Sequence, residues 1–429
     1  METIQNKDTW YKLDTAAKLY PAILSPKQAS VFRLSCILKE PVDPEILQAA
    51  LTVTIRRYPT FNVRLKRGIF WFYFETNEKL PMIRTESVHP CQLIDPKENN
   101  DFLFQVSWFE SRINLEIFHG ITDGSGGLEF LKTLIYYYLL LQGKTVQTSG
   151  MIRTLEQTAD PEETENSFHR YYDPHLQSSR GEEKAYHLSG KTLLEHQLRL
   201  IHGLIPAEEL VNKARSYQAT VTEYLTAVLL SAFFVVDNGQ SDPDKIVKIS
   251  VPINLRNLFP SQTLRNFSFF VNVGERFRNR QTGFDILLST VKTQMKSQIR
   301  KDLIAARMNP NVSMEKNTAL QVVPLDIKQA LIKQVHRIVG DDLFTCSLSN
   351  LGVIKMPESM APFISRFDFS LSISERVPLN CSICSSNGIV SCTFSSSLRE
   401  ASVEQAFFRI LAADRLPITI ESNQNSGKQ

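Results

Sequence analysis

Long hydrophobic runs are missing from this sequence. The longest nearly apolar segment covers residues 225–236, whereas a helix that crosses a bilayer needs about 20 consecutive apolar residues. Residues 1–7 contain no apolar core segment either, so we expect no signal peptide. The sequence therefore predicts a protein without an integral membrane segment.

A strong charge of one sign is missing too. The 429 residues include 48 Lys and Arg against 45 Asp and Glu, which gives a formal net charge of +3. This excess is too small to indicate a nucleic-acid partner or attraction to a membrane surface. We therefore expect no nucleic acid among the partners.

Cysteine is scarce, with six residues in the chain. Without a secretory signal, this usage is typical of reduced thiols and favours a cytoplasmic protein. Cys381 and Cys384 form a Cys-x-x-Cys pair, but they fall in a predicted hairpin that turns at Asn387 and Gly388. Residues three apart on a strand face opposite sides, so we expect no metal site there.

The remaining composition, with 42% hydrophobic and 22% charged residues, is that of an ordinary globular protein. A chain of 429 residues exceeds what one hydrophobic core normally serves, so two lobes are expected. The polar stretch over residues 145–192 is predicted to form the crossover or linker between the two lobes. We predict a first lobe of residues 1–185, a second lobe of residues 186–421 and a disordered tail of residues 422–429.

Both predicted lobes mix strands with helices. Asp43 is the expected N-cap of a helix over residues 44–58, and a capping box predicts a deeply buried helix after Thr220. A further helix is predicted over residues 319–338, and the aromatic run of residues 70–74 is assigned to a strand buried on both faces. Hairpins covered by helices indicate an α+β layered architecture.

One segment combines a strand end, a tight corner and residues able to do chemistry. Residues 112–118 alternate between polar and apolar, as in a strand with one buried face. His119 continues the apolar row, and Asp123 and Gly124 follow in a glycine-rich corner before a helical pattern. Catalytic groups are often held at such strand ends, and a His can act there as a general base. A buried, hydrogen-bonded His without chemistry is the alternative.

The pattern His-x-x-x-Asp-Gly, formed by His119, Asp123 and Gly124, resembles the signature of the acyltransferase superfamily built on the chloramphenicol acetyltransferase fold. Residues 250–256, Ser-Val-Pro-Ile-Asn-Leu-Arg, and residues 349–352, Ser-Asn-Leu-Gly, are also similar to segments of that superfamily. The condensation-domain and alcohol acetyltransferase branches are the most similar ones. The resemblance implies an α+β fold of two chloramphenicol-acetyltransferase-like lobes, each a mixed, largely antiparallel sheet covered by helices, with a tunnel between them.

The resemblance also implies roles for single residues. His119 corresponds to the catalytic His that removes a proton from the acceptor. Asp123 corresponds to a structural Asp that pairs with an Arg, and Arg256 is the candidate partner, since a lone buried carboxylate would be costly. Gly124 permits a turn that a Cβ would obstruct.

Ser349 and Asn350 match positions near the tunnel of the superfamily. Either side chain could donate a hydrogen bond to a developing oxyanion. An Asx-type turn at the end of a strand is the alternative for this pair.

The activity that the resemblance implies is acyl transfer from a thioester to an alcohol or amine. The donor would be acyl-CoA or the phosphopantetheine thioester of an acyl carrier protein, the acceptor would be a small molecule, and no bound cofactor is expected. Two other functions stay open. One is a non-catalytic condensation-like module that binds a carrier protein or another partner, and the other is a hydrolase in which the same His activates water.

Overall fold

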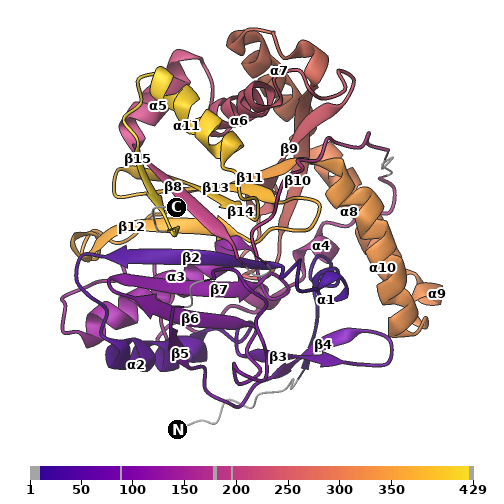
Figure 1. The fold of residues 1–429 in the computed structure, drawn as a ribbon. Helices are drawn as coiled ribbons and strands as arrows, with labels where there is room; N and C mark the ends of the chain where they lie inside the picture. The colour runs from indigo at the N-terminus through magenta and orange to yellow at the C-terminus, as the bar shows by residue number, and fades with distance from the viewer. Residues whose placement is uncertain (1–9, 87–88, 177–180, 195–196, 425–429) are drawn as a thin grey trace.

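Two large β-sheets, each with helices against it, make up most of the molecule (Figure 1). The computed structural model describes residues 10–86, 89–176, 181–194 and 197–424. One sheet has five strands in the order β12 (Ile364–Leu371), β2 (Val31–Leu38), β7 (Arg112–Phe118), β6 (Phe104–Phe109) and β5 (Ile83–Thr85). Neighbouring strands of this sheet are antiparallel, except that β5 runs parallel to β6.

The second sheet has seven strands and is likewise mixed. Their order is β10 (Ser268–Arg276), β9 (Ile246–Asn254), β11 (Cys346–Val353), β13 (Leu379–Ser386), β14 (Ile389–Ser396), β8 (Arg199–Pro206) and β15 (Thr419–Ser422). Strand β11 runs parallel to both of its neighbours, and the other pairs are antiparallel. A small third sheet contains β1 (Trp10–Lys12), β4 (Phe72–Thr76) and β3 (Val63–Arg67).

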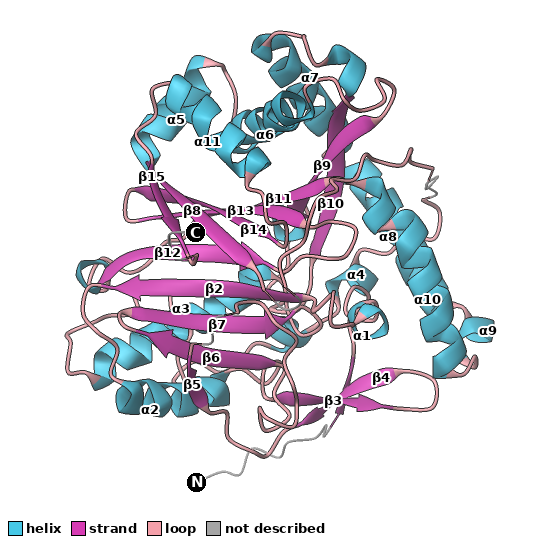
Figure 2. Cartoon of the chain, in the orientation of Figure 1, coloured by secondary structure: helices cyan, strands magenta, loops and turns pink. Residues whose placement is uncertain are grey.

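The helices cover these sheets in two groups. In the first half, α2 (Pro44–Thr54) packs on α3 (Gly124–Leu141), which contacts β2. Above the seven-stranded sheet, Figure 2 shows a layer formed by α5 (Ala207–Ser216), α6 (Val221–Asp237), α7 (Phe284–Gln298) and α11 (Ser402–Ala413). The remaining helices are α1 (Tyr20–Ile23), α4 (Ser167–Arg170), α8 (Lys301–Lys316), α9 (Thr318–Gln321) and α10 (Leu325–Val339). The α+β prediction, with mixed sheets covered by helices, is confirmed.

Strand β12 crosses from one half of the chain to the other. It lies between elements of the second half in the sequence, yet it pairs with β2 in the five-stranded sheet. Its Phe367 and Phe369 belong to the hydrophobic core of that sheet. The first sheet is therefore incomplete without a strand from the predicted second lobe. The lobe boundaries at residue 185 and the tunnel stay predictions.

Local signals in the sequence account for several helix starts and one hairpin. The Asp43 side chain accepts from two N–H groups at the start of α2, and Thr220 and Glu223 form the predicted capping box of α6. Asn387 and Gly388 have positive φ and join β13 to β14, as a two-residue hairpin requires. The structure confirms these predictions. They could be made from the sequence because each depends only on residues close together in the chain.

Two predictions about secondary structure and order are wrong, and one helix was not predicted. The helix expected over residues 319–338 is interrupted before Leu325, where Pro324 is the N-cap of α10. The sequence analysis assigned no element to residues 301–316, which form α8 with Pro310 inside it. The tail predicted from residue 422 starts too early: Ser422 ends β15, and the Asn423 side chain accepts a hydrogen bond from the Leu200 N–H at 2.8 Å. The rest of that tail, residues 425–429, lies outside the described residues.

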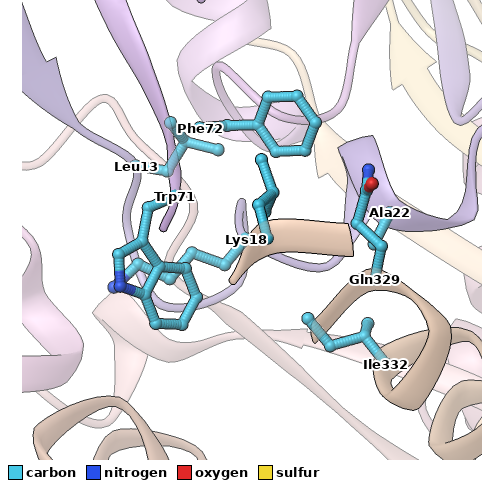
Figure 3. Close-up of a pocket in the computed structure, with 8 residues that line it drawn as sticks. Leu13, Lys18, Ala22, Trp71, Phe72, Gln329 and Ile332 are labelled. Carbon is cyan, nitrogen blue, oxygen red and sulfur yellow. The ribbon is translucent and has the colours of Figure 1, made fainter. Parts of the chain in front are cut away.

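The aromatic run of residues 70–74 is not buried on both faces as predicted. Phe70 is 41% exposed at the tip of the β3–β4 hairpin. Trp71 and Phe72 instead line a cavity of about 10 Å³ between the hairpin, α1 and α10, and Figure 3 shows Lys18 extending beside the Trp71 ring. A cavity of this size holds one water at most, so the aromatic residues attach α10 to the first half rather than bind a ligand.

The two thiols of the Cys-x-x-Cys pair face apart, as the strand period predicted. Cys381 packs into the core of the seven-stranded sheet, and Cys384 packs into the core of the five-stranded sheet. Strand β13 therefore contributes to both cores. Among the described residues, no three His, Cys, Asp or Glu side chains are grouped in a way that could hold a metal ion.

Within the described part of the chain, no single helix has the length and hydrophobicity to cross a membrane. Helices α5 and α6 reach that length only together, and they meet at a bend of 80°.

Candidate active site

His119 follows the last residue of β7, at the corner that leads into α3. Its backbone N–H donates to the Ser30 carbonyl at 2.8 Å. The imidazole stacks on the Tyr20 ring at 4.7 Å between centroids and meets the Phe32 ring edge-on at 5.1 Å. The residue as a whole is of intermediate exposure, and aromatic packing holds the ring.

A polar contact from the other half of the chain reaches the same ring. His119 Nδ1 lies 2.9 Å from Asn266 Oδ1, just before β10. Asn266 Nδ2 in turn donates to Asp14 Oδ2 at 3.2 Å. Both Asn266 and Asp14 are buried, at 1% and 0% exposure. His119 thus contacts Asn266, which forms a buried polar pair with Asp14. The sequence analysis did not identify this pair.

Asp123 is the N-cap of α3 and bonds to four groups. Its Oδ1 accepts from the N–H groups of Ser125 and Gly126. Its Oδ2 accepts from Arg256 Nη1 at 2.7 Å and from the Phe267 N–H at 2.8 Å. The ion pair predicted between Asp123 and Arg256 is present in the structure, and the carboxylate has no hydrogen bond to the His119 ring.

Arg256 connects this corner to the loop that carries Asn266. Its guanidinium donates to the carbonyls of Thr263 and Arg265 at 2.7 to 3.0 Å. Because Asp123 fixes the guanidinium and the guanidinium fixes the loop, the ion pair helps to place Asn266 against His119. Arg256 lies in the short helical turn Leu255–Asn257, which follows β9 directly.

Two glycines let other segments approach the start of α3. A Cβ on Gly124 would lie 2.6 Å from the Leu351 Cδ2 atom, and a Cβ on Gly126 would lie 2.1 Å from the Leu264 carbonyl oxygen. Neither glycine has a positive φ. The two glycines instead leave space for neighbouring segments of the same chain. A side chain would be tolerated less well at Gly126, because its Cβ would meet a backbone atom.

Ser349 and Asn350 lie on β11, next to the leucine that packs on Gly124. Asn350 uses both ends of its amide: Nδ2 donates to Thr222 Oγ1 at 3.0 Å, and Oδ1 accepts from the Gly352 N–H at 2.8 Å. This arrangement is of the Asx type and leaves Asn350 poorly suited to hold an oxyanion. Ser349 is partly exposed, and its hydroxyl makes no hydrogen bond to the described residues.

Burial lowers the pKa of His119 below its ordinary value. The Asp123 carboxylate and the hydrogen bond to Asn266 act in the opposite direction without cancelling the effect of burial. The ring is therefore neutral near pH 7, which is the form that can accept a proton.

The comparisons with known proteins concern the whole chain. No protein-family model matches it, and no match was found among curated proteins. Solved structures do match. Fusarium graminearum TRI101, complexed with coenzyme A and T-2 mycotoxin, gives a TM-score of 0.60 at 10% identity and covers 97% of this chain and 100% of its own.

Two further structures support the same fold. The first condensation domain of the CDA synthetase gives a TM-score of 0.57 at 15% identity, covering 96% of this chain and 100% of its own. TRI3 trichothecene 15-O-acetyltransferase from Fusarium sporotrichioides gives 0.58 at 8% identity, covering 96% of each chain. The chain has the fold of these condensation domains and acetyltransferases over nearly its full length, as its resemblance to the superfamily predicted.

Proposed function

We propose that this protein is an acyltransferase that moves an acyl group from a thioester to an alcohol or amine, with His119 as the general base. The observation that carries the proposal is the placement of the His119 imidazole, whose pKa is lowered by burial, at the corner where segments of both halves meet. The fold supports it, because proteins with the same architecture include an O-acetyltransferase and a condensation domain.

The proposed reaction is a proton transfer coupled to nucleophilic attack. A ring nitrogen of His119 takes the proton from the acceptor O–H or N–H, and the acceptor oxygen or nitrogen attacks the thioester carbonyl carbon. The carbonyl oxygen carries the negative charge in the tetrahedral intermediate, where the Ser349 hydroxyl is the candidate donor. When the C–S bond breaks, the thiolate takes the proton from the imidazolium, so an ester or amide and a free thiol are formed and the base is restored.

Asp123, Gly124 and Arg256 support the site structurally in this proposal. The bonds of Asp123 go to backbone N–H groups and to Arg256, so it neither receives the substrate proton nor contacts the ring. Asn350 is held by Thr222 and Gly352 and has no assigned part in the reaction.

The donor class follows from the need for a thiol leaving group. Coenzyme A and a carrier-protein phosphopantetheine present the same thioester, and TRI101 binds coenzyme A in the matched structure. We propose acyl-CoA as the first donor to test, with an acyl carrier protein as the second. No cofactor takes part in the proposed reaction.

The experiment is a panel of donors and acceptors with free thiol as the readout. Short and long acyl-CoA and acyl carrier proteins are each combined with alcohols and amines, and the product is identified by mass. Thiol release that depends on an acceptor supports the transferase. Release that is equal without any acceptor supports the hydrolase, and binding of a carrier protein without release from any donor supports the non-catalytic module.

A further inference from the structure

We infer that Asn266 and Asp14 are positioning residues that hold His119 in one tautomer, with the proton on Nδ1 and the lone pair of Nε2 available as the base. The carrying observation is the unbroken set of contacts from Asp14 through the Asn266 amide to His119 Nδ1, at 3.2 and 2.9 Å. The inference deepens the proposed function, but the tautomer itself is a property of the folded protein and can be measured without any substrate.

The surroundings of Asp14 fix the orientation of the amide. Asp14 Oδ1 accepts from the Ala17 N–H at 2.7 Å, and Oδ2 accepts from the Asn266 backbone N–H at 3.3 Å. The Arg265 guanidinium approaches the same Oδ2 atom at 3.6 Å. Burial raises the pKa of Asp14, while Arg265 and these donors act in the opposite direction. Because both carboxyl oxygens already accept backbone N–H bonds, the Asn266 NH₂ group faces Asp14 and the Asn266 carbonyl faces the histidine.

This orientation decides which ring nitrogen carries the proton. Because Asn266 Oδ1 can only accept, His119 Nδ1 must donate. In the neutral imidazole the other nitrogen, Nε2, is then the acceptor. The packing of Tyr20 and Phe32 on the ring limits its rotation, so Nε2 keeps a constant direction.

The motif carboxylate cannot perform this task. Both oxygens of Asp123 bond to backbone N–H groups and to Arg256, and none of these bonds reaches the ring. The charged groups that act on the ring are Asp123 and Asp14, and Arg265 stands against Asp14. The tautomer therefore depends on the neutral amide of Asn266 and on the hydrogen bond of the ring to the His119 backbone, neither of which adds a charge.

The test is nitrogen-15 NMR of protein labelled at histidine, with the His119 signals assigned by their loss in His119→Gln. The parent protein is expected to show the Nδ1–H form alone at a pH above the His119 pKa. Asn266→Ala removes the side-chain acceptor and leaves only the bond to the His119 backbone, so the Nε2–H form should appear beside the Nδ1–H form. Parent spectra with the proton on Nε2, or an unchanged tautomer in folded Asn266→Ala, would overturn the inference.

Asp14→Asn provides a second variant of nearly the same size, in case Asn266→Ala does not fold. It removes the acceptor-only partner, so the Asn266 amide is free to turn over and the Nδ1–H form should lose its dominance. Asn272→Ala is the matched control, because Asn272 is another buried asparagine, on β10, whose amide bonds to Glu182 instead. A tautomer change of equal size in the control would contradict the specific role of Asn266.

Turnover gives the second readout. With an active donor and acceptor pair, Asn266→Ala should lower kcat at least about tenfold while KM changes little, because a wrong tautomer removes the base and leaves substrate binding intact. If no thioester is turned over by the parent protein, the proposed function fails while the NMR result still decides the inference. If a variant has mixed tautomers and an unchanged kcat, catalysis does not depend on the tautomer, and the positioning role is refuted.

Discussion

At the scale of single residues, the environment of His119 decides when its ring can accept a proton. Burial lowers its pKa from the ordinary value of 6.5, so the neutral form persists to lower pH than in a free histidine. The base is lost only when pH falls through this lowered pKa. We expect kcat/KM to decline on the acid side with a midpoint below 6.5. A midpoint above that value would mean that the ring is stabilised as an imidazolium.

Asp123 has two structural contributions that a pair of variants can separate. Asp123 and Asp43 each accept from two N–H groups at a helix start, but only Asp123 also pairs with a mostly buried Arg256. Asp43→Ala should lower the free energy of unfolding by about 1 kcal/mol, as the loss of a cap does. Asp123→Ala should lower it by about 3 kcal/mol or more, because an uncompensated charge stays behind. Denaturation in urea measures both, and equal losses would refute the stabilising role of the ion pair.

At the scale of elements, the start of α3 depends on close approach of a second segment. A Cβ on Gly126 would meet the Leu264 backbone, whereas a Cβ on Gly124 would meet only the movable end of Leu351. Overpacking against backbone costs about 1–3 kcal/mol. Gly126→Ala should therefore destabilise the protein more than Gly124→Ala in urea unfolding. The reverse order would show that Gly124, the glycine of the sequence motif, tolerates a Cβ less well than Gly126.

The elements that the sequence predicted well are those with local causes. The Asp43 cap, the Thr220 capping box and the hairpin turn after β13 each involve neighbouring residues. Helix α8 was not predicted, although its buried Ile304, Met308 and Val312 recur at helical spacing. Pro310 lies inside it, and proline disfavours the interior of a helix. That spacing is the signal that could have identified α8.

At the scale of the whole molecule, the site is assembled from distant parts of the chain. The sequence predicted His119, Asp123 and Arg256 from motif residues and a resemblance. It gave no indication of Asn266 or Asp14, which are 252 positions apart and meet only through the fold. No spacing rule relates such residues, so a buried polar partner of this kind becomes visible only in coordinates.

The same long-range contacts should make the protein unfold as one unit. Strand β12 completes the first sheet from the second half of the chain, and the Asp123–Arg256 pair joins the two halves again. We expect a single calorimetric transition for the full chain, since neither half keeps its contacts alone. In Asp123→Ala the transition should move to lower temperature and stay single. Two separated transitions in the parent protein would show that the halves are independent.

The central claim is that His119 is the base for acyl transfer, and acceptor-dependent thiol release by His119→Ala tests it most directly. The variant should unfold at a temperature close to that of the parent protein and lose about 10²–10⁴-fold in turnover, which is the range that a positioned general base contributes. A folded His119→Ala protein that releases thiol at the parental rate would contradict the account.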